Sequence, residues 1–174
     1  MTPVSPRPAT LQDLDQVIEL LWAVAAEGRW LGTEVPFDRA VHRQSLAELI
    51  GRPEAALLVA EAGGPTGVVG YISLEVARYG VANLHLLITE GWRGRGLGRA
   101  LLEAGLAWAA GAGAHKAALE VWPDNEAALA LYRRAGFVEE GRKRRHYRRA
   151  NGDLWDAVLM GRPLIEPNPC QPGS

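Results

Sequence analysis

The sequence predicts a mixed α+β fold in which one central twisted sheet of about six or seven strands carries helices on both faces. Two hairpin candidates, at residues 55–76 and 137–160, flank a strand–helix–strand segment at residues 82–122. Hairpins join antiparallel strands, whereas a strand–helix–strand crossover joins parallel ones. The sheet is therefore expected to be mostly antiparallel, with one parallel pair near its middle.

Two helices are expected before the first of these strands. Apolar side chains recur at three- and four-residue intervals over residues 11–25, which is typical of a helix that buries one face. Thr10 precedes this segment as a candidate N-cap, and Gly28 ends it. A second helix is expected from Asp38 to Ile50, where a following glycine and proline stop it.

Three strand segments and a helix make up the centre of the chain. Residues 55–61 and 68–76 flank the loop AGGPTG, whose glycine and proline content predicts a hairpin. Residues 82–89 form the third strand candidate, which ends just before a glycine-rich stretch. Residues 98–110 then show the spacing of a buried helical face.

The last third of the chain contains a strand, a short helix and a second hairpin. Residues 116–122 are expected to form the strand, and residues 125–135 a helix that stops at Gly136. Residues 137–149 and 154–160 flank an Asn-Gly pair, which is the strongest short-range signal of a hairpin.

Composition places the chain among ordinary globular proteins. Of the 174 residues, 48% are apolar and 22% are charged, and a single domain is expected over residues 1–162. A Pro-rich tail, residues 163–174, carries the only cysteine, Cys170. No stretch has the ~18 uninterrupted apolar residues of a membrane span. The first nine residues lack the apolar block of a secretory signal, so a cytoplasmic protein without a membrane partner is expected.

The charge is uneven along the chain. The net charge of −1 argues against a general nucleic-acid binder, which would need a basic surface. Residues 142–149, RKRRHYRR, nevertheless form a concentrated basic strip. Two interpretations stay open: an exposed edge strand whose charges oppose aggregation, or a grip on an acidic group of a substrate, a protein or a cofactor.

The stretch RGRGLGR, residues 93–99, lies between the third strand candidate and the following helix. It lacks the lysine of a Walker loop, and its G-x-G-x-G spacing differs from the dinucleotide fingerprint G-x-G-x-x-G. A strand–helix junction leaves backbone N–H groups without partners and directs the helix dipole at anions. Together with Arg95 and Arg99, this position predicts a cradle for a pyrophosphate-bearing ligand, with a plain connecting turn as the alternative.

Two motifs in this part of the chain follow each other at a set distance. The first is [Q/R]-x-x-G-x-[G/A], which begins here at Arg93, and the second is N-x-x-A-x-x-x-Y-x-x-x-G-F, which begins at Asn125. Both resemble the signature of the GNAT superfamily of N-acetyltransferases, and the resemblance extends over residues 7–160. One departure is Glu90, at a position where the family often has proline, which leaves the path of the loop open.

The resemblance implies a GNAT-like acyl-CoA N-acyltransferase fold and acetyl-CoA as the cofactor, with coenzyme A as product. It implies cofactor contacts along the end of the third strand, the glycine-rich stretch and the second motif: Leu86, Leu87, Ile88, Arg93, Gly94, Arg95, Gly96, Leu97, Gly98, Arg99, Asn125 and Tyr132. In the family a backbone N–H before the glycine loop stabilises the oxyanion, and a tyrosine protonates the departing thiolate. These roles fall to Ile88 and Tyr132, although Tyr132 taken alone also fits a core tyrosine.

The sequence does not single out the base that removes a proton from the attacking ammonium. Glu75, His85 and Glu34 are candidates, and each also has a plain structural interpretation. In the family the acceptor lies between the first two helices and the last hairpin. This location implies Trp30, Glu34 and Tyr147 as substrate-binding residues.

The resemblance therefore implies an acetyl-CoA-dependent N-acetyltransferase that acts on a primary amine. A free amino acid or a related small amine is the favoured acceptor, with a protein N-terminus or a lysine as the alternative. A non-catalytic acetyl-CoA sensor and a nucleic-acid module are the alternatives of other classes. No metal is expected, because no Cys, His and carboxylate cluster has ligand spacing. Family members often dimerise, so a homodimer is an expectation.

Overall fold

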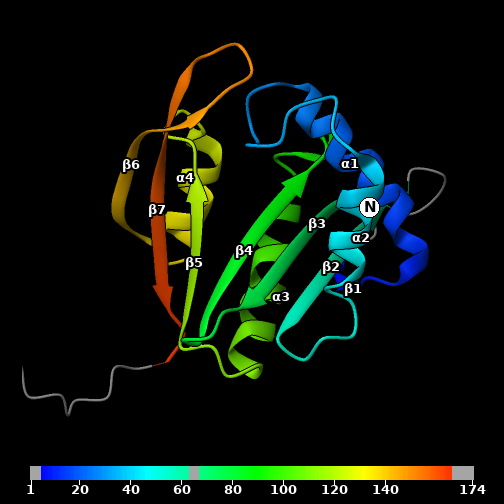
Figure 1. The fold of residues 1–174 in the computed structure, drawn as a ribbon. Helices are drawn as coiled ribbons and strands as arrows, with labels where there is room; N and C mark the ends of the chain where they lie inside the picture. The colour runs from blue at the N-terminus through cyan, green and yellow to red at the C-terminus, as the bar shows by residue number, and fades with distance from the viewer. Residues whose placement is uncertain (1–4, 63–66, 166–174) are drawn as a thin grey trace, which may run out of the picture.

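The computed structural model describes residues 5–62 and 67–165, which form one seven-stranded sheet (Figure 1). The strand order is β1-β2-β3-β4-β5-β7-β6, and every neighbouring pair is antiparallel except β4 and β5. The strands are β1 (Arg7–Pro8), β2 (Ala55–Ala62), β3 (Gly67–Val76), β4 (Val81–Ile88), β5 (Lys116–Val121), β6 (Val138–Arg148) and β7 (Leu154–Pro163). The predicted mixed α+β fold with a central parallel pair is confirmed.

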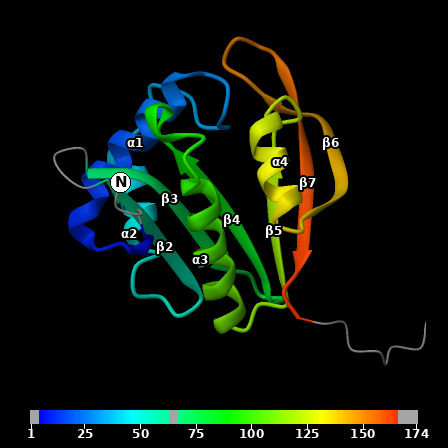
Figure 2. The ribbon, with the colours of Figure 1, turned by 180° about the vertical axis from the view of Figure 1, so that it is seen from behind.

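Helices cover both faces of this sheet (Figures 1 and 2). They are α1 (Leu14–Ala26), α2 (Arg39–Ala47), α3 (Leu97–Gly111) and α4 (Glu126–Arg134), with short 3-10 turns η1 (Leu11–Asp13) and η2 (Glu90–Trp92). One apolar cluster lies under α1, and a second lies under α3 and α4. Strand residues alternate between the faces, so Leu84 of β4 packs under α3 and Leu87 packs under α1.

Some observed boundaries differ from the expected ones. The second helix ends at Ala47, and backbone bonds between residues three apart continue the chain as turns to Ile50. The short strand β1, which the sequence did not indicate, extends the sheet beside β2. Residues 63–66 of the AGGPTG loop and the tail from residue 166, with Cys170, lie outside the described residues. No helix in the described ranges is long and apolar enough to cross a membrane.

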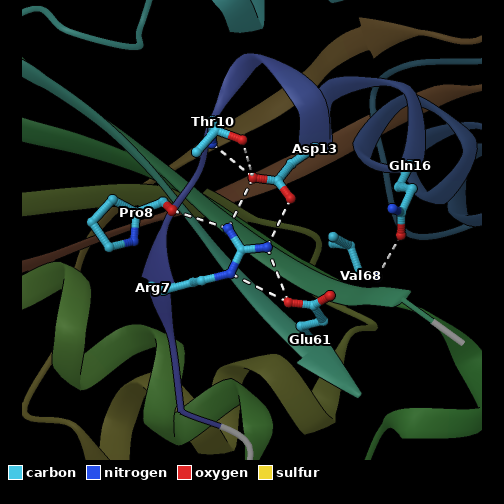
Figure 3. Close-up of polar contacts among 7 residues, drawn as sticks. All are labelled: Arg7, Pro8, Thr10, Asp13, Gln16, Glu61 and Val68. Atoms are coloured by element: carbon cyan, nitrogen blue, oxygen red, sulfur yellow. Dashed lines mark hydrogen bonds and ion pairs between the residues drawn. The ribbon is translucent and has the colours of Figure 1, made fainter. Parts of the chain in front are cut away.

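A charged network at the N-terminal edge joins three elements of the fold (Figure 3). Arg7 of β1 donates Nη1 and Nη2 to the two carboxylate oxygens of Asp13 at 2.9 and 2.8 Å, and Nη2 also donates to Glu61 of β2 at 3.0 Å. Asp13 further accepts bonds from the backbone N–H and the hydroxyl of Thr10 at 2.7 and 3.0 Å. Only 9% of the Asp13 side chain is exposed, and its hydrogen bonds with Arg7 hold the pKa of this carboxyl well below its usual range.

We expect Asp13→Asn to lower the free energy of unfolding by about 2 kcal/mol at pH 7, the typical cost of losing hydrogen bonds to a charged group. The pKa of Asp13 is depressed in the folded state, so its stabilisation is present above the unfolded value near 4 and is lost as the pH falls. The difference between wild type and variant in denaturant titrations should therefore shrink below about pH 4.

Asp15→Asn is the matched control, because Asp15 pairs with Arg43 at 2.7 Å while 82% of its side chain is exposed. Loss of this surface pair should cost less than about 1 kcal/mol. Equal losses in the two variants at pH 7 would contradict the structural role assigned to the Arg7 network.

Candidate active site

The glycine-rich stretch forms the turn that leads from β4 through η2 into α3. Gly94 and Gly96 have φ angles of 73° and 84°, a left-handed conformation that glycine adopts without the steric cost of a β-carbon. Within the described parts of the chain, no N–H group of residues 94–99 donates a hydrogen bond, whereas the flanking N–H groups of Arg93 and Ala100 do. The turn therefore presents a row of free donors at the N-terminal end of α3, an arrangement that binds anions.

Gly98 brings this row close to the end of β4. A β-carbon on Gly98 would lie 3.1 Å from Cδ2 of Leu131 in α4 and 3.3 Å from Cδ1 of Ile88. Contacts that short require the neighbours to move, so glycine allows the start of α3 to pack between β4 and α4. The free N–H groups consequently lie beside the end of β4.

The arginines of the stretch point in different directions. Arg99 pairs with Glu103 one turn further along α3 at 2.7 Å, and Arg95 stacks on Trp92 at 4.8 Å from the ring centroid. Arg93 points inward, where its Nε donates to the Ile88 carbonyl at 2.9 Å. Its side chain and its N–H group, which donates to the Glu90 carbonyl at 3.2 Å, are thus both bound within the protein, so the structure does not support the cofactor contact expected from the donors of this residue.

β4 and β5 separate at the centre of the sheet. Their parallel pairing covers only residues 81–83 of β4, and the two strands diverge beyond it (Figure 1). Thr89 donates its N–H to β3 at 3.0 Å, and N–H groups alternate in direction along a strand. The N–H groups of Leu86 and Ile88 therefore point into the gap, while that of Leu87 points toward β3. The Ile88 N–H is thus not used by either neighbouring strand.

Tyr132 lies in α4 and Asn125 at its start, on the same face of the sheet as α3. The Tyr132 ring is buried against Phe137, with ring centroids 5.8 Å apart, and burial raises the pKa of its phenol. The phenol stays protonated at neutral pH, and its hydroxyl has no hydrogen-bond partner among the residues that the structure describes. Asn125 caps α4, because its Oδ1 accepts the N–H of Ala128 at 3.2 Å. The Tyr132 ring is thus part of the core, while its hydroxyl proton is not engaged in a hydrogen bond with the described residues.

A cluster of titratable side chains lies on the opposite face of the sheet, the face of α1. Glu120 of β5 accepts a bond from Lys143 Nζ at 2.5 Å and another from the Tyr147 hydroxyl. The residues on either side of Glu120 are buried under α3 and α4, so Glu120 itself lies on the α1 face. His85 of β4 lies on this face too, because its neighbour Leu84 packs under α3.

The pKa values of this pair are shifted by burial and by charge. Desolvation by the surrounding protein lowers the pKa of the His85 imidazole even though the residue is exposed, and the charge of Glu120 opposes the shift. Desolvation raises the pKa of Glu120, but hydrogen bonds from Lys143 and Tyr147 outweigh it and leave this pKa below its ordinary value. At neutral pH the pair therefore consists of a neutral imidazole and a carboxylate. Sequence reasoning missed Glu120, which the alternation of residues 116–122 could have placed on the same face as His85.

The α1–α2 loop and the β6–β7 hairpin meet near the open end of the gap (Figure 1). Arg149, only 5% exposed, donates Nη1 to the carbonyls of Leu31 and Gly32 at 2.8 and 3.0 Å. Its Nη2 lies 3.4 Å from Glu34, which also accepts the N–H of Ala150 at 2.9 Å. Glu34 thus fastens the two segments together.

Of the remaining candidates, Trp30 and Tyr147 lie on the two segments that meet here, and Glu75 lies elsewhere. Trp30 lies in the α1–α2 loop, and Tyr147 of β6 packs edge-on against Trp122 with centroids 5.1 Å apart. Glu75 lies toward the other end of β3: it pairs with Asn83, whereas Gly70 pairs with Ile88. It also forms an ion pair with Arg52 at 3.1 Å. The structure therefore does not bring Glu75 to the gap.

The basic strip lies on β6, the outermost strand of the sheet. This placement supports the exposed-edge interpretation for most of the strip. Lys143 and Arg149 differ from the rest because they are bonded to Glu120 and to the α1–α2 loop. Arg142 lies 3.7 Å from Asp156 of the adjacent strand β7.

Comparison with known proteins connects this geometry to a family. The model of the Acetyltransferase (GNAT) family matches residues 15–137. An N-alpha-acetyltransferase of Sulfurisphaera tokodaii is 34% identical over 172 residues, which cover 91% of this chain and 92% of that protein. The N-alpha-acetyltransferase RimI of Mycobacterium tuberculosis is 44% identical over 68 residues, which cover 39% of this chain and 41% of that protein.

A solved structure has the same fold. The phosphinothricin acetyltransferase (Pat) from Sinorhizobium meliloti, in complex with AcCoA, superposes with a TM-score of 0.85 at 22% identity and covers 99% of this chain and 94% of that one. The family match covers more than half of the chain, and the Sulfurisphaera relative is similar over nearly all of it. The chain therefore belongs to the GNAT acetyltransferase family and is an acetyl-CoA-dependent N-acetyltransferase.

Proposed function

We propose that this enzyme acetylates the α-amine at the N-terminus of a polypeptide, and that transfer takes place beside Ile88 in the gap between β4 and β5. The observation that carries the proposal is the position of the free N–H groups of residues 94–99 next to the open edge of β4. The N–H groups of residues 94–99 suit a diphosphate, and the unpaired N–H of Ile88 at the edge of β4 suits an oxyanion. Two relatives that are N-alpha-acetyltransferases support the choice of an α-amine.

The pairing of two cations on the α1 face, Lys143 and Arg149, favours a peptide over a free amino acid as the acceptor. A free amino acid carries a carboxylate, whose burial needs a cation or several hydrogen-bond donors. Lys143 and Arg149, which reach this face from the β6–β7 hairpin, already bind Glu120 and the α1–α2 loop. A peptide presents an uncharged carbonyl instead. We assign Trp30, Glu34 and Tyr147 to the walls around its first residue.

Each step of the proposed reaction uses one group of the chain. His85 accepts the proton that the amine must lose before it attacks, and the Glu120 carboxylate stabilises the resulting imidazolium. The Ile88 N–H stabilises the charge that develops on the thioester oxygen as the C–N bond forms, an effect worth about 10²–10³ in rate for one donor. Tyr132 gives its proton to the departing sulfur as the C–S bond breaks, and its phenolate is reprotonated by the second proton, which the nitrogen loses as the amide forms.

The acceptor class can be tested with purified protein, acetyl-CoA and a panel of amines, with release of free thiol and product mass as readouts. The panel holds peptides with a free N-terminus, the same peptides with a blocked N-terminus and one lysine, and free amino acids. We expect thiol release with the free N-terminus and one acetyl group on its α-amine. Faster acetylation of free amino acids would contradict the peptide assignment, and cofactor binding without any thiol release would favour a sensor.

Tyr132→Phe should lower kcat by about 10²-fold, the lower end of the usual contribution of a general acid, while acetyl-CoA affinity stays nearly unchanged. The matched control is Tyr71→Phe, because Tyr71 is likewise buried, with a raised pKa, but packs under α1. Steady-state kinetics should show no loss of kcat for the control. Equal kcat values in the two variants would remove the role assigned to Tyr132.

Glu120→Gln should move the acidic limb of the pH–rate profile to lower pH. His85 acts only when neutral, so kcat falls as the pH drops through its pKa. Burial lowers this pKa and the charge of Glu120 raises it, so removing that charge lowers it further. His85→Gln should abolish the limb. An acidic limb that stays in place in both variants would mean that another group is the base.

A further inference from the structure

One carboxylate, that of Glu27 just beyond α1, receives hydrogen bonds from both halves of the active site. Its Oε1 accepts Nη2 of Arg93 at 2.5 Å, and its Oε2 accepts Nη1 of Arg93 at 2.7 Å. The indole N–H of Trp30 also donates to Oε2, at 2.5 Å. Arg93 opens the glycine-rich stretch, and Trp30 lies in the loop that we assign to the acceptor.

Arg93 extends this connection to the reacting end of β4. Its third donor, Nε, binds the carbonyl of Ile88, the residue whose N–H points into the gap. An unbroken chain of hydrogen bonds therefore runs from Trp30 through Glu27 and Arg93 to Ile88. The free N–H groups of residues 94–99 begin at Gly94, the residue after Arg93.

The bonds in this chain are of the strong kind. The Arg93 and Glu27 side chains are 33% and 23% exposed, so water screens their attraction only in part. The hydrogen bonds from Arg93 hold the pKa of Glu27 below its ordinary value, which keeps the carboxylate ionised at neutral pH. A two-pronged arginine–carboxylate pair also fixes the orientation of both side chains.

We propose that Glu27 is a positioning residue that couples acetyl-CoA binding to the ordering of the acceptor loop, residues 28–37. A diphosphate held by residues 94–99 restrains Arg93, Arg93 restrains Glu27, and Glu27 holds Trp30 in place. Such coupling is reciprocal, so a bound acceptor strengthens cofactor binding by the same factor. The inference rests on the proposed function in one respect, the assignment of the 28–37 loop to the acceptor.

Hydrogen–deuterium exchange of the 28–37 segment, with and without coenzyme A, tests the coupling without any acceptor. Coenzyme A should slow exchange in the wild type by about tenfold, within the usual range of coupling between two sites. Most of this protection should be lost in Glu27→Gln. The matched control is Glu19→Gln, which makes the same change within α1 and breaks an exposed pair with Arg39. Protection that is equal in the two variants would overturn the proposal.

Trp30→Phe supplies a second route, because it removes only the indole donor and leaves the Glu27–Arg93 pair in place. It too should reduce the protection, and the double variant with Glu27→Gln should lose no more than Glu27→Gln alone. With an active acceptor, both single variants should raise the acceptor KM by about tenfold and change kcat less. Losses that add in the double variant would contradict a shared path.

The two proposals can fail separately. If the wild type acetylates no peptide while the exchange results hold, the acceptor assignment is wrong and the coupling stands. If peptides are acetylated but coenzyme A leaves the 28–37 segment equally exchangeable in wild type and Glu27→Gln, the coupling is wrong and the proposed function stands.

Discussion

The separation of β4 from β5 beyond Asn83 is the constraint on which the whole site depends. Strands that stayed paired would use the N–H groups of Leu86 and Ile88 in the sheet and leave none for an oxyanion. A buried N–H without a partner costs about 1–3 kcal/mol, so such a gap persists only where solvent or a ligand supplies that partner. The free N–H groups of residues 94–99, a few residues further along the chain, likewise need solvent or a ligand as their hydrogen-bond partner. Strand edge and helix start thus supply two sets of donors, which are separated along the chain by the bonded N–H groups of Thr89, Trp92 and Arg93.

In the proposed reaction, the two faces of the sheet supply different groups. Tyr132 and the start of α3 lie on one face, where burial of the Tyr132 ring raises the pKa of its phenol. His85, which we propose as the base, and the Glu120 carboxylate lie on the other face. The gap is where the two faces meet, and in the proposed reaction the amine attacks the acetyl group there. The hydrogen bonds of Arg149 to the α1–α2 loop, and those of Glu27 to Arg93 and Trp30, connect the loops around this point.

Local patterns in the sequence predicted much of this arrangement. Glycine spacing between a strand and a helix indicated the free N–H groups, the alternation around His85 gave its face, and the Asn-Gly pair gave the last hairpin. The roles of Glu27, Glu34 and Glu75 could not be predicted, because each depends on a partner far away in the chain. Glu34 binds Arg149, 115 positions later, and Glu75 pairs with Asn83 near the start of β4, away from the gap. The sequence shows that a glutamate is negatively charged, but not which cation binds it in the folded protein.

The most direct measurement of the central claim is the NMR response of individual backbone N–H groups to acetyl-CoA. The signals of residues 94–99 and of Ile88 should shift downfield as the ligand saturates, since hydrogen bonds to phosphate and thioester oxygens deshield the amide proton. Acetylpantetheine, which lacks the diphosphate, should affect Ile88 at high concentration and leave residues 94–99 unchanged. Saturation with acetyl-CoA that leaves the signals of residues 94–99 in place would contradict the account.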